Sequence, residues 1–220
     1  MAKVKVKICG ITNWVDARRA VTEGAELLGF NFYAGSPRYV EPAKAKRIVS
    51  RLPKQTLVVG VFVNESEQKM LEIARAVGLD ALQLHGDETP AMVARLKRSF
   101  PVIKAIRVKA SAAGTGQMGR FKQATALLLD GFDGRQRGGT GKTFDWEIAR
   151  RAKKHGRIFL AGGLTPENIG AAIRAARPYA VDICSGVEAR PGKKDPALMK
   201  NLMRAARHAQ KSAQKPKRSA

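Results

Sequence analysis

The chain has 220 residues, of which 44% are hydrophobic, so it can bury a sizeable core and is not a wholly disordered chain. Lysine and arginine number 41 against 18 aspartates and glutamates, and the resulting formal net charge of +23 suggests anionic partners. Two cysteines are too few for a disulfide framework or a four-cysteine zinc site, and no apolar run reaches the ~18–20 residues of a membrane span. Residues 3–8 alternate lysine with valine or isoleucine and lack the apolar stretch of a signal peptide, so we expect a cytoplasmic protein with reduced thiols.

Short runs of β-branched residues and leucine recur along the sequence, and segments with the apolar spacing of helices lie between them. The predicted strands span residues 4–8, 27–32, 57–63, 81–85, 102–107, 126–130, 158–161 and 180–184. A repeated order of strand and helix predicts an α/β fold with a parallel sheet. Eight such units in a chain of this length predict a single (β/α)8 TIM barrel, which we expect to span residues 1–210.

Capping residues and glycines divide the predicted helices from the strands. The expected start signals are Asn13, Pro42, Thr165 and Asp195, and the expected stop signals are Gly24, Gly78 and Gly156. A doubly wound open sheet is the rival fold. It usually carries a glycine-rich turn after its first strand, whereas the corresponding turn here reads Cys9-Gly10-Ile11-Thr12.

In (β/α)8 barrels the functional residues lie at the carboxyl ends of the strands. The predicted strand ends carry an unusually polar set, namely Cys9, Asn31, Asn64, His85, Arg107, Asp130, Gly162, Gly163, Cys184, Ser185 and Gly186. Alternation of side chains places Lys7 and Cys9 on the inner face of the first strand, and Gln83 on the same face as His85. Because the first and eighth strands are neighbours in a closed barrel, Lys7 and Asp182 could pair. The alternative is that Lys7 is a solvated charge at the edge.

Two glycine-containing turns follow the seventh and eighth predicted strands, where many barrels bind phosphate through backbone N–H groups. The candidate phosphate-binding residues are therefore Gly162, Gly163, Ser185 and Gly186. The alternative is that these residues form two tight turns that bind no ligand. Residues 138–143 resemble the end of a P-loop, but the glycine that the motif requires is replaced by Gln136. We interpret that segment as a glycine-rich active-site loop.

Residues 7–12 read Lys-Ile-Cys-Gly-Ile-Thr, which resembles the opening signature of the phosphoribosylanthranilate isomerases. The resemblance continues in residues 29–33, 36–40, 59–64, 82–86, 128–130, 138–146, 161–168 and 181–188. These blocks follow one another from the first strand to the eighth and cover nearly the whole chain except its end. The ordered set is more specific than any one block.

The resemblance implies an Amadori rearrangement of N-(5-phosphoribosyl)anthranilate to 1-(2-carboxyphenylamino)-1-deoxyribulose 5-phosphate in tryptophan biosynthesis, without a cofactor or metal. It implies that Asp130 is the general acid and Cys9 the general base. The substrate-binding residues expected are Arg38 at the anthranilate end, Asp182 at the hydroxyls, Gly162, Gly163, Ser185 and Gly186 at the phosphate, and His85, with Lys7 and Gln83 in support.

The residue types suit this chemistry, because ring opening needs an acid and proton removal beside a C=N bond needs a base. A carboxyl and a thiol have reference pKa values of about 4 and about 8.5, so at least one pKa must shift. Burial beside Leu128 would raise the pKa of Asp130, and Lys7 would lower the pKa of Cys9. A small buried hydrophobe is the usual role of a lone cysteine and is the alternative for Cys9.

One position departs from the family pattern, since the eighth loop reads Cys184-Ser185-Gly186 where the family commonly has Ser-Ser-Gly. This places a second thiol on the strand next to Cys9. Neighbouring strands lie about 4.8 Å apart, within the separation of about 7 Å that a disulfide allows between Cα atoms. We hypothesise a reversible Cys9–Cys184 bridge under oxidation. The alternative is that Cys184 merely replaces a loop serine.

Residues 211–220 contain no large apolar residue and predict a basic, disordered tail. No aromatic residue is present there to stack on bases, so we expect no nucleic-acid partner. The expected partner is a small sugar phosphate, with no membrane contact, for a monomer or homodimer. A related isomerase of histidine biosynthesis uses aspartates as acid and base, which Cys9 argues against. A basic RNA-associated barrel rests only on the charge and the tail.

Overall fold

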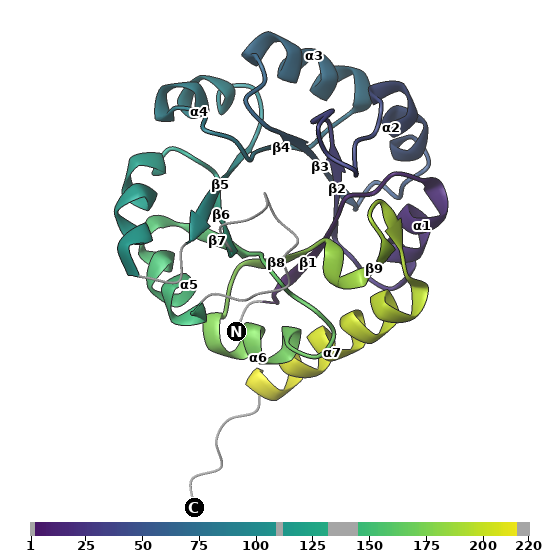
Figure 1. Cartoon of the computed structure of the whole chain (residues 1–220), viewed down its shortest axis with the longest axis vertical. Helices are drawn as coiled ribbons and strands as arrows, with labels where there is room; N and C mark the ends of the chain where they lie inside the picture. Colours follow the sequence, from purple (N-terminus) through teal and green to yellow (C-terminus); the bar gives the residue numbers. More distant parts are fainter. Residues whose placement is uncertain (1–2, 109–111, 132–144, 215–220) are drawn as a thin grey trace, which may run out of the picture.

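The computed structural model describes residues 3–108, 112–131 and 145–214, and in these ranges the predicted (β/α)8 barrel is confirmed. Eight parallel strands close into a ring, and Figure 1 shows the helices arranged around its outside. The strands are β1 (Lys5–Cys9), β2 (Leu27–Asn31), β3 (Leu57–Phe62), β4 (Ala81–Leu84), β5 (Val102–Val108), β6 (Ala126–Gly131), β7 (Arg157–Leu160) and β8 (Ala180–Ile183). The predicted strands agree with these within about two residues at each end, the usual uncertainty of boundaries.

The outer layer consists mainly of α-helices, one after most strands. These are α1 (Trp14–Thr22), α2 (Pro42–Val49), α3 (Glu67–Val77), α4 (Pro90–Leu96), α5 (Trp146–Ala152), α6 (Ile169–Ala176) and α7 (Pro196–Gln214). The 3-10 helix η1 (Ala112–Phe121) follows β5 in place of an α-helix. Its sequence contains three glycines, Gly114, Gly116 and Gly119, which are poor α-helix formers.

Short elements complete the chain. The 3-10 helix η2 (Lys153–His155) follows α5, and η3 (Ser185–Val187) follows β8. The strands β9 (Glu188–Arg190) and β10 (Lys193–Lys194) then pair as an antiparallel hairpin before α7 begins. This hairpin brings charged residues back to the carboxyl end of the barrel.

Most of the predicted helix ends are marked as expected. The Asn13 carboxamide accepts a hydrogen bond from the Asp16 N–H (2.9 Å), and the Asp195 carboxylate accepts one from the Leu198 N–H (2.9 Å). Gly78 ends α3 in the left-handed conformation (φ 82°). These local signals need no tertiary contact, which explains why the sequence reveals them.

The predicted start of a helix at Thr165 is wrong, because α6 begins at Ile169. The Asn168 side chain instead accepts a hydrogen bond from the Thr165 N–H (2.9 Å) and donates one to the Gly163 carbonyl (2.7 Å). These two bonds hold residues 163–168 as a loop beside the barrel mouth. The Asn168 side chain, at the N-cap position of α6, therefore stabilises the turn after β7 and does not cap the helix.

The last helix is longer than expected, since α7 runs to Gln214 and includes the first residues of the predicted tail. Two side chains attach it to the first part of the chain: Gln210 donates to the Val4 carbonyl (2.9 Å) and Arg207 to the Glu23 carbonyl (2.7 Å). The rest of the predicted tail, residues 215–220, lies outside the described residues.

The core has two layers, as the alternation along β1 predicts. Val4, Val6 and Ile8 belong to a large cluster between the barrel and its helices. A smaller cluster fills the barrel interior, and it includes Leu27, Val59, Ile103, Leu128 and Phe159. The inner side chains fill the barrel below its mouth, so the candidate catalytic residues lie directly above a packed apolar layer.

Leu128→Ala tests the inner layer. Leu128 is completely buried inside the barrel, and we expect its truncation to lower the free energy of unfolding by about 2–5 kcal/mol, because it removes apolar contacts and leaves a cavity. Urea unfolding followed by circular dichroism measures the change. Val15→Ala is the control, since Val15 is 66% exposed. A loss of less than 1 kcal/mol for Leu128→Ala would mean that the interior is not close-packed.

Candidate active site

The carboxyl ends of the strands surround a cavity of about 470 Å³, which gathers most of the residues that the sequence selects. Those lining it are Cys9, Asn31, Arg38, Gln83, His85, Asp130, Gly162, Gly163, Asp182, Cys184, Ser185 and Gly186. Lys7 is completely buried and contacts this set from below through Asp182. Arg107 lines a neighbouring cavity of about 540 Å³, and the predicted glycine-rich loop of residues 138–143 lies outside the described residues.

Lys7 and Asp182 form a buried ion pair across the contact between β1 and β8. The two residues are partners in the strand register, and the Lys7 Nζ lies 2.9 Å from the Asp182 Oδ1. Burial by itself would lower the pKa of Lys7, but the charges of Asp182 and Cys9 outweigh it and hold that pKa above its ordinary value. Burial raises the pKa of Asp182 to about 6, against the opposing charge of Lys7. Both groups are therefore charged at neutral pH, and the interpretation of Lys7 as a solvated edge charge is wrong.

Cys9 ends β1 and lies against the backbone of Gly29 on β2. A Cβ atom at Gly29 would come within 2.7 Å of the Cys9 Sγ and 3.0 Å of the Lys7 Nζ, so only glycine leaves room for both. A hydrogen bond with the Cys184 thiol lowers the pKa of Cys9 well below its ordinary value, aided by the charges of Lys7 and Lys194 and opposed by burial. The site therefore favours the thiolate, the form that can accept a proton.

Asp130 is the penultimate residue of β6 and belongs to a chain of polar side chains on the inner face of the barrel. Its Oδ2 lies 3.3 Å from the His85 Nε2, and the Gln83 amide nitrogen lies 3.0 Å from the His85 Nδ1. Donation from Gln83 to Nδ1 leaves the proton of the ring on Nε2, which then faces the carboxylate. Gln83 and His85 thus orient Asp130, which lies across the cavity on a strand that is not adjacent to that of Cys9.

The loops after β7 and β8 pack against each other through glycines. Gly162 and Gly163 both have positive φ (86° and 62°), a conformation that other residues rarely adopt. A side chain on Gly186 would collide with the carbonyl of Leu164. Backbone groups of both loops therefore reach the cavity closely, which is the arrangement that suits an anion. A phosphate role for these loops stays a prediction.

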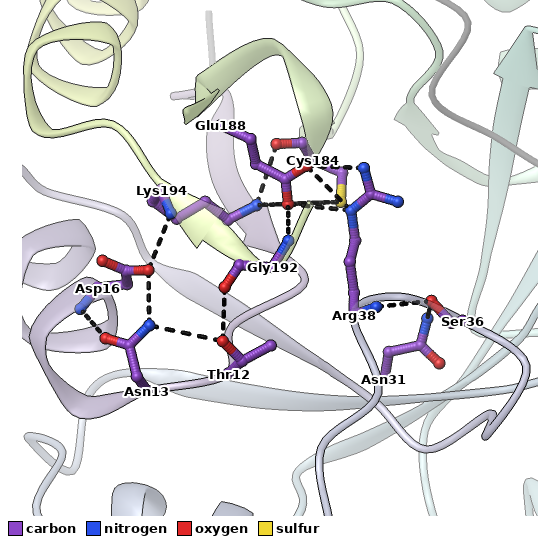
Figure 2. Close-up of polar contacts among 10 residues, drawn as sticks. All are labelled: Thr12, Asn13, Asp16, Asn31, Ser36, Arg38, Cys184, Glu188, Gly192 and Lys194. Carbon is purple, nitrogen blue, oxygen red and sulfur yellow. Dashed lines mark hydrogen bonds and ion pairs between the residues drawn. The ribbon is translucent and has the colours of Figure 1, made fainter. Parts of the chain in front are cut away.

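Two charged residues of this region were not selected from the sequence. Glu188 accepts hydrogen bonds from the Arg38 guanidinium, and Lys194 approaches the same carboxylate, as Figure 2 shows. Both residues lie on the hairpin of β9 and β10, beyond the last barrel strand. The only sequence signal for Glu188 is an acidic residue three positions after Ser185 in a strongly basic chain. That signal does not distinguish Glu188 from a carboxylate at the surface.

Among residues 3–108, 112–131 and 145–214, no group of three or more His, Cys, Asp and Glu side chains could hold a metal ion. Over the same ranges, no helix combines the length and the apolar character that crossing a bilayer requires.

The fold and the cavity define a class of protein, the (β/α)8-barrel enzymes with a thiol, a carboxyl and two glycine-rich loops at the barrel mouth. Residues 6–205 match the family of N-(5'-phosphoribosyl)anthranilate (PRA) isomerases. The N-(5'-phosphoribosyl)anthranilate isomerase of Moorella thermoacetica is 46% identical over 214 residues, which are 97% of this chain and 94% of that protein.

Two solved structures are similar over nearly their whole length. Monomers generated from the dimeric phosphoribosylanthranilate isomerase of Thermotoga maritima superpose with a TM-score of 0.84 at 41% identity, covering 93% of this chain and 99% of theirs. A phosphoribosyl anthranilate isomerase bound to reduced 1-(o-carboxyphenylamino)-1-deoxyribulose 5-phosphate gives a TM-score of 0.84 at 40% identity with the same coverage. The chain belongs to the phosphoribosylanthranilate isomerase family, and it is an isomerase of tryptophan biosynthesis, as its sequence motifs predict.

The acidity of Cys9 provides a test of the site. Cys184→Ala removes the thiol that lowers the pKa of Cys9, so we expect the pKa of Cys9 to rise. The rate of Cys9 alkylation by iodoacetamide, followed by mass spectrometry across pH, reports the thiolate. A lower pKa keeps the thiolate present at lower pH, so the wild-type profile should lie at lower pH than that of Cys184→Ala. Cys184→Ser keeps a hydroxyl donor and is the control; superimposable profiles for all three proteins would contradict the effect.

The hypothesis of a reversible disulfide is also open to experiment. Both cysteines are free in the structure; Cys9 ends β1, and Cys184 directly follows the neighbouring strand β8. Diamide accepts two electrons and two protons from the thiol pair, so we expect it to form a Cys9–Cys184 bridge, abolish activity and allow dithiothreitol to restore it. Mass spectrometry identifies the crosslink. Equal loss and recovery of activity in Cys184→Ser would show that this bridge is not responsible.

Proposed function

We propose that the cavity isomerises N-(5'-phosphoribosyl)anthranilate by general acid–base catalysis, with Asp130 as the acid and Cys9 as the base. The observation that carries the proposal is the position of the two groups: a thiol whose pKa is lowered and a carboxyl oriented by His85 line one cavity from non-adjacent strands. The relative bound to a reduced form of the product supports this substrate.

The first step is opening of the ribose ring. Asp130 donates a proton to the ring oxygen, the C1′–O bond breaks, and the lone pair of the anthranilate nitrogen forms a C=N bond at C1′. The His85 Nε2 lies 3.3 Å from the carboxylate and helps to fix its direction. Because the substrate's own amine forms the Schiff base, the reaction needs no cofactor.

The second step removes the proton from C2′. The Cys9 thiolate accepts this proton, and the electron pair of the C–H bond moves toward the C=N bond to give an enolamine. Tautomerisation of the enolamine then yields the ketone of the product. The positive charge of Lys7 lies close to the thiolate and stabilises it before the proton arrives.

The rest of the cavity suits the parts of the substrate that do not react. The glycine-rich loops around Gly163 and Gly186 would hold the phosphate through backbone N–H groups, and Ser185 would add a hydroxyl donor. Asp182 would bind sugar hydroxyls. Arg38 would face the carboxylate of anthranilate, since a guanidinium matches a carboxylate in charge and shape.

The other parts of the proposal concern assembly and surroundings. We expect a homodimer, because the similar enzyme of Thermotoga maritima is dimeric, and we expect the protein to work in the cytoplasm. The similar proteins do not support the histidine-biosynthesis isomerase as an alternative, and Cys9 argues against it because that enzyme uses aspartates as both acid and base. A role in RNA binding rests only on the net charge of +23 and on the basic tail.

The test is the conversion of freshly prepared phosphoribosylanthranilate, followed by the loss of anthranilate-type fluorescence. We expect Cys9→Ala and Asp130→Asn each to lower kcat by roughly 10²–10⁴, because each removes one proton-transfer group. Circular dichroism should show native folding in both variants. Val15→Ala, at an exposed position, is the control and should keep full activity. Turnover close to that of the wild type in either active-site variant would overturn the role assigned to that residue.

A further inference from the structure

The hairpin that follows β8 sends a carboxylate to the wall of the cavity. Glu188, the first residue of β9, is almost completely buried at its side chain, with 4% exposed. Its Oε1 lies 2.9 Å from the Arg38 Nε, and its Oε2 lies 2.7 Å from the Arg38 Nη2. Two parallel hydrogen bonds of this kind fix the plane and the direction of a guanidinium, whereas one bond would let it turn.

The carboxylate of Glu188 is itself held in place. It accepts a hydrogen bond from the Lys194 Nζ (3.0 Å) and a longer one from the Gly192 N–H (3.3 Å). The Lys194 Nζ also donates to the Cys184 carbonyl at the end of β8 (3.0 Å). Figure 2 shows Lys194 and Gly192 reaching the Glu188 carboxylate from one side and Arg38 reaching it from the other.

The hairpin is also attached to the start of α1. The Thr12 hydroxyl donates to the Gly192 carbonyl (2.6 Å), and the Lys194 N–H donates to the Asp16 carboxylate (2.9 Å). Asp16 is in turn bonded by the Asn13 carboxamide (2.7 Å). Glu188 therefore stands on a framework that is anchored to β8 and to α1, and it can determine the position of a flexible arginine.

One nitrogen of the Arg38 guanidinium makes no hydrogen bond to Glu188. Glu188 occupies Nε and Nη2, and within the described residues Nη1 has no hydrogen-bond partner. Arg38 lines the cavity that contains Cys9 and Asp130. Glu188 has one negative charge between the two positive charges of Arg38 and Lys194, so this trio keeps a net charge of +1 and still attracts an anion.

We propose that Glu188 is a positioning residue that holds Arg38 as a fixed receptor for the carboxylate on the aromatic ring of the substrate. The inference rests on the proposed function, in which Arg38 faces the anthranilate end. An arginine free to change rotamers would lose side-chain entropy each time it bound the carboxylate. Because Glu188 already restricts Arg38 in the folded protein, no such entropy is lost on binding. Glu188 therefore strengthens binding of substrates that bear the carboxylate and has no effect on those that lack it.

The test compares two ligands that differ only in that group. One is reduced 1-(o-carboxyphenylamino)-1-deoxyribulose 5-phosphate, and the other is the same compound without the ring carboxylate. Glu188→Gln would leave Lys194 buried without its charge partner and could prevent folding. Glu188→Asp avoids this, because it keeps a negative charge near Lys194 but is too short to hold both nitrogens of Arg38.

Isothermal titration calorimetry should show that Glu188→Asp weakens binding of the carboxylated ligand about tenfold, the equivalent of one charge-assisted hydrogen bond, and leaves the other ligand within about twofold. In an Arg38→Ala background, Glu188→Asp should produce no further change in the ratio of the two affinities. Glu67→Gln is the matched control: it removes another carboxylate that pairs with an arginine, Arg95, at the exposed surface, and it should alter neither affinity.

The outcomes separate this inference from the proposed function. If Glu188→Asp weakens both ligands equally, or neither, the positioning role is overturned even when the wild-type protein isomerises phosphoribosylanthranilate. The positioning role is also overturned if, in the Arg38→Ala background, Glu188→Asp still lowers the affinity for the carboxylated ligand relative to the affinity for the other ligand. If the wild-type protein does not convert phosphoribosylanthranilate at all, the proposed function fails, whatever the ratio of affinities shows.

Discussion

The ion pair of Lys7 and Asp182 is the interaction on which the mouth of the barrel depends. Lys7 is completely buried, and an uncompensated ammonium in that position would cost several kcal/mol. The pair joins β1 to β8, the strands at which the barrel closes, so closure of the sheet and compensation of the charge require each other. Removing either partner would leave the other charged group buried, a change that typically costs about 3–5 kcal/mol.

The same arrangement recurs around the cavity and determines its chemistry. Lys194 pairs with Glu188, and Lys104 on β5 pairs with Glu88 in the loop after β4, with all four side chains nearly buried. In a chain with 41 basic and 18 acidic residues, several carboxylates are thus used to neutralise buried lysines. Because charges interact more strongly away from water, Lys7 and Lys194 help to lower the pKa of Cys9, while the surface keeps most of the excess positive charge.

The sequence by itself determined the order of the elements and the position of the candidate catalytic residues along the chain. Alternation of apolar strands with helical segments is a local pattern, as are the caps at Asn13 and Asp195, so both can be recognised without tertiary contacts. Cys9 and Asp130 were identifiable because each lies at the carboxyl end of a predicted strand, and the carboxyl ends of all strands in a parallel barrel face one cavity.

Only the tertiary structure decided which side chains meet and with what effect. The pairing of Glu188 with Arg38 joins residues far apart in the sequence, and neither residue has a local pattern that names its partner. The thiol of Cys184 became the largest influence lowering the pKa of Cys9 because the strand register brings β8 beside β1. In each case the outcome depends on distances set by closure of the barrel, a property of the whole sheet that no single segment encodes.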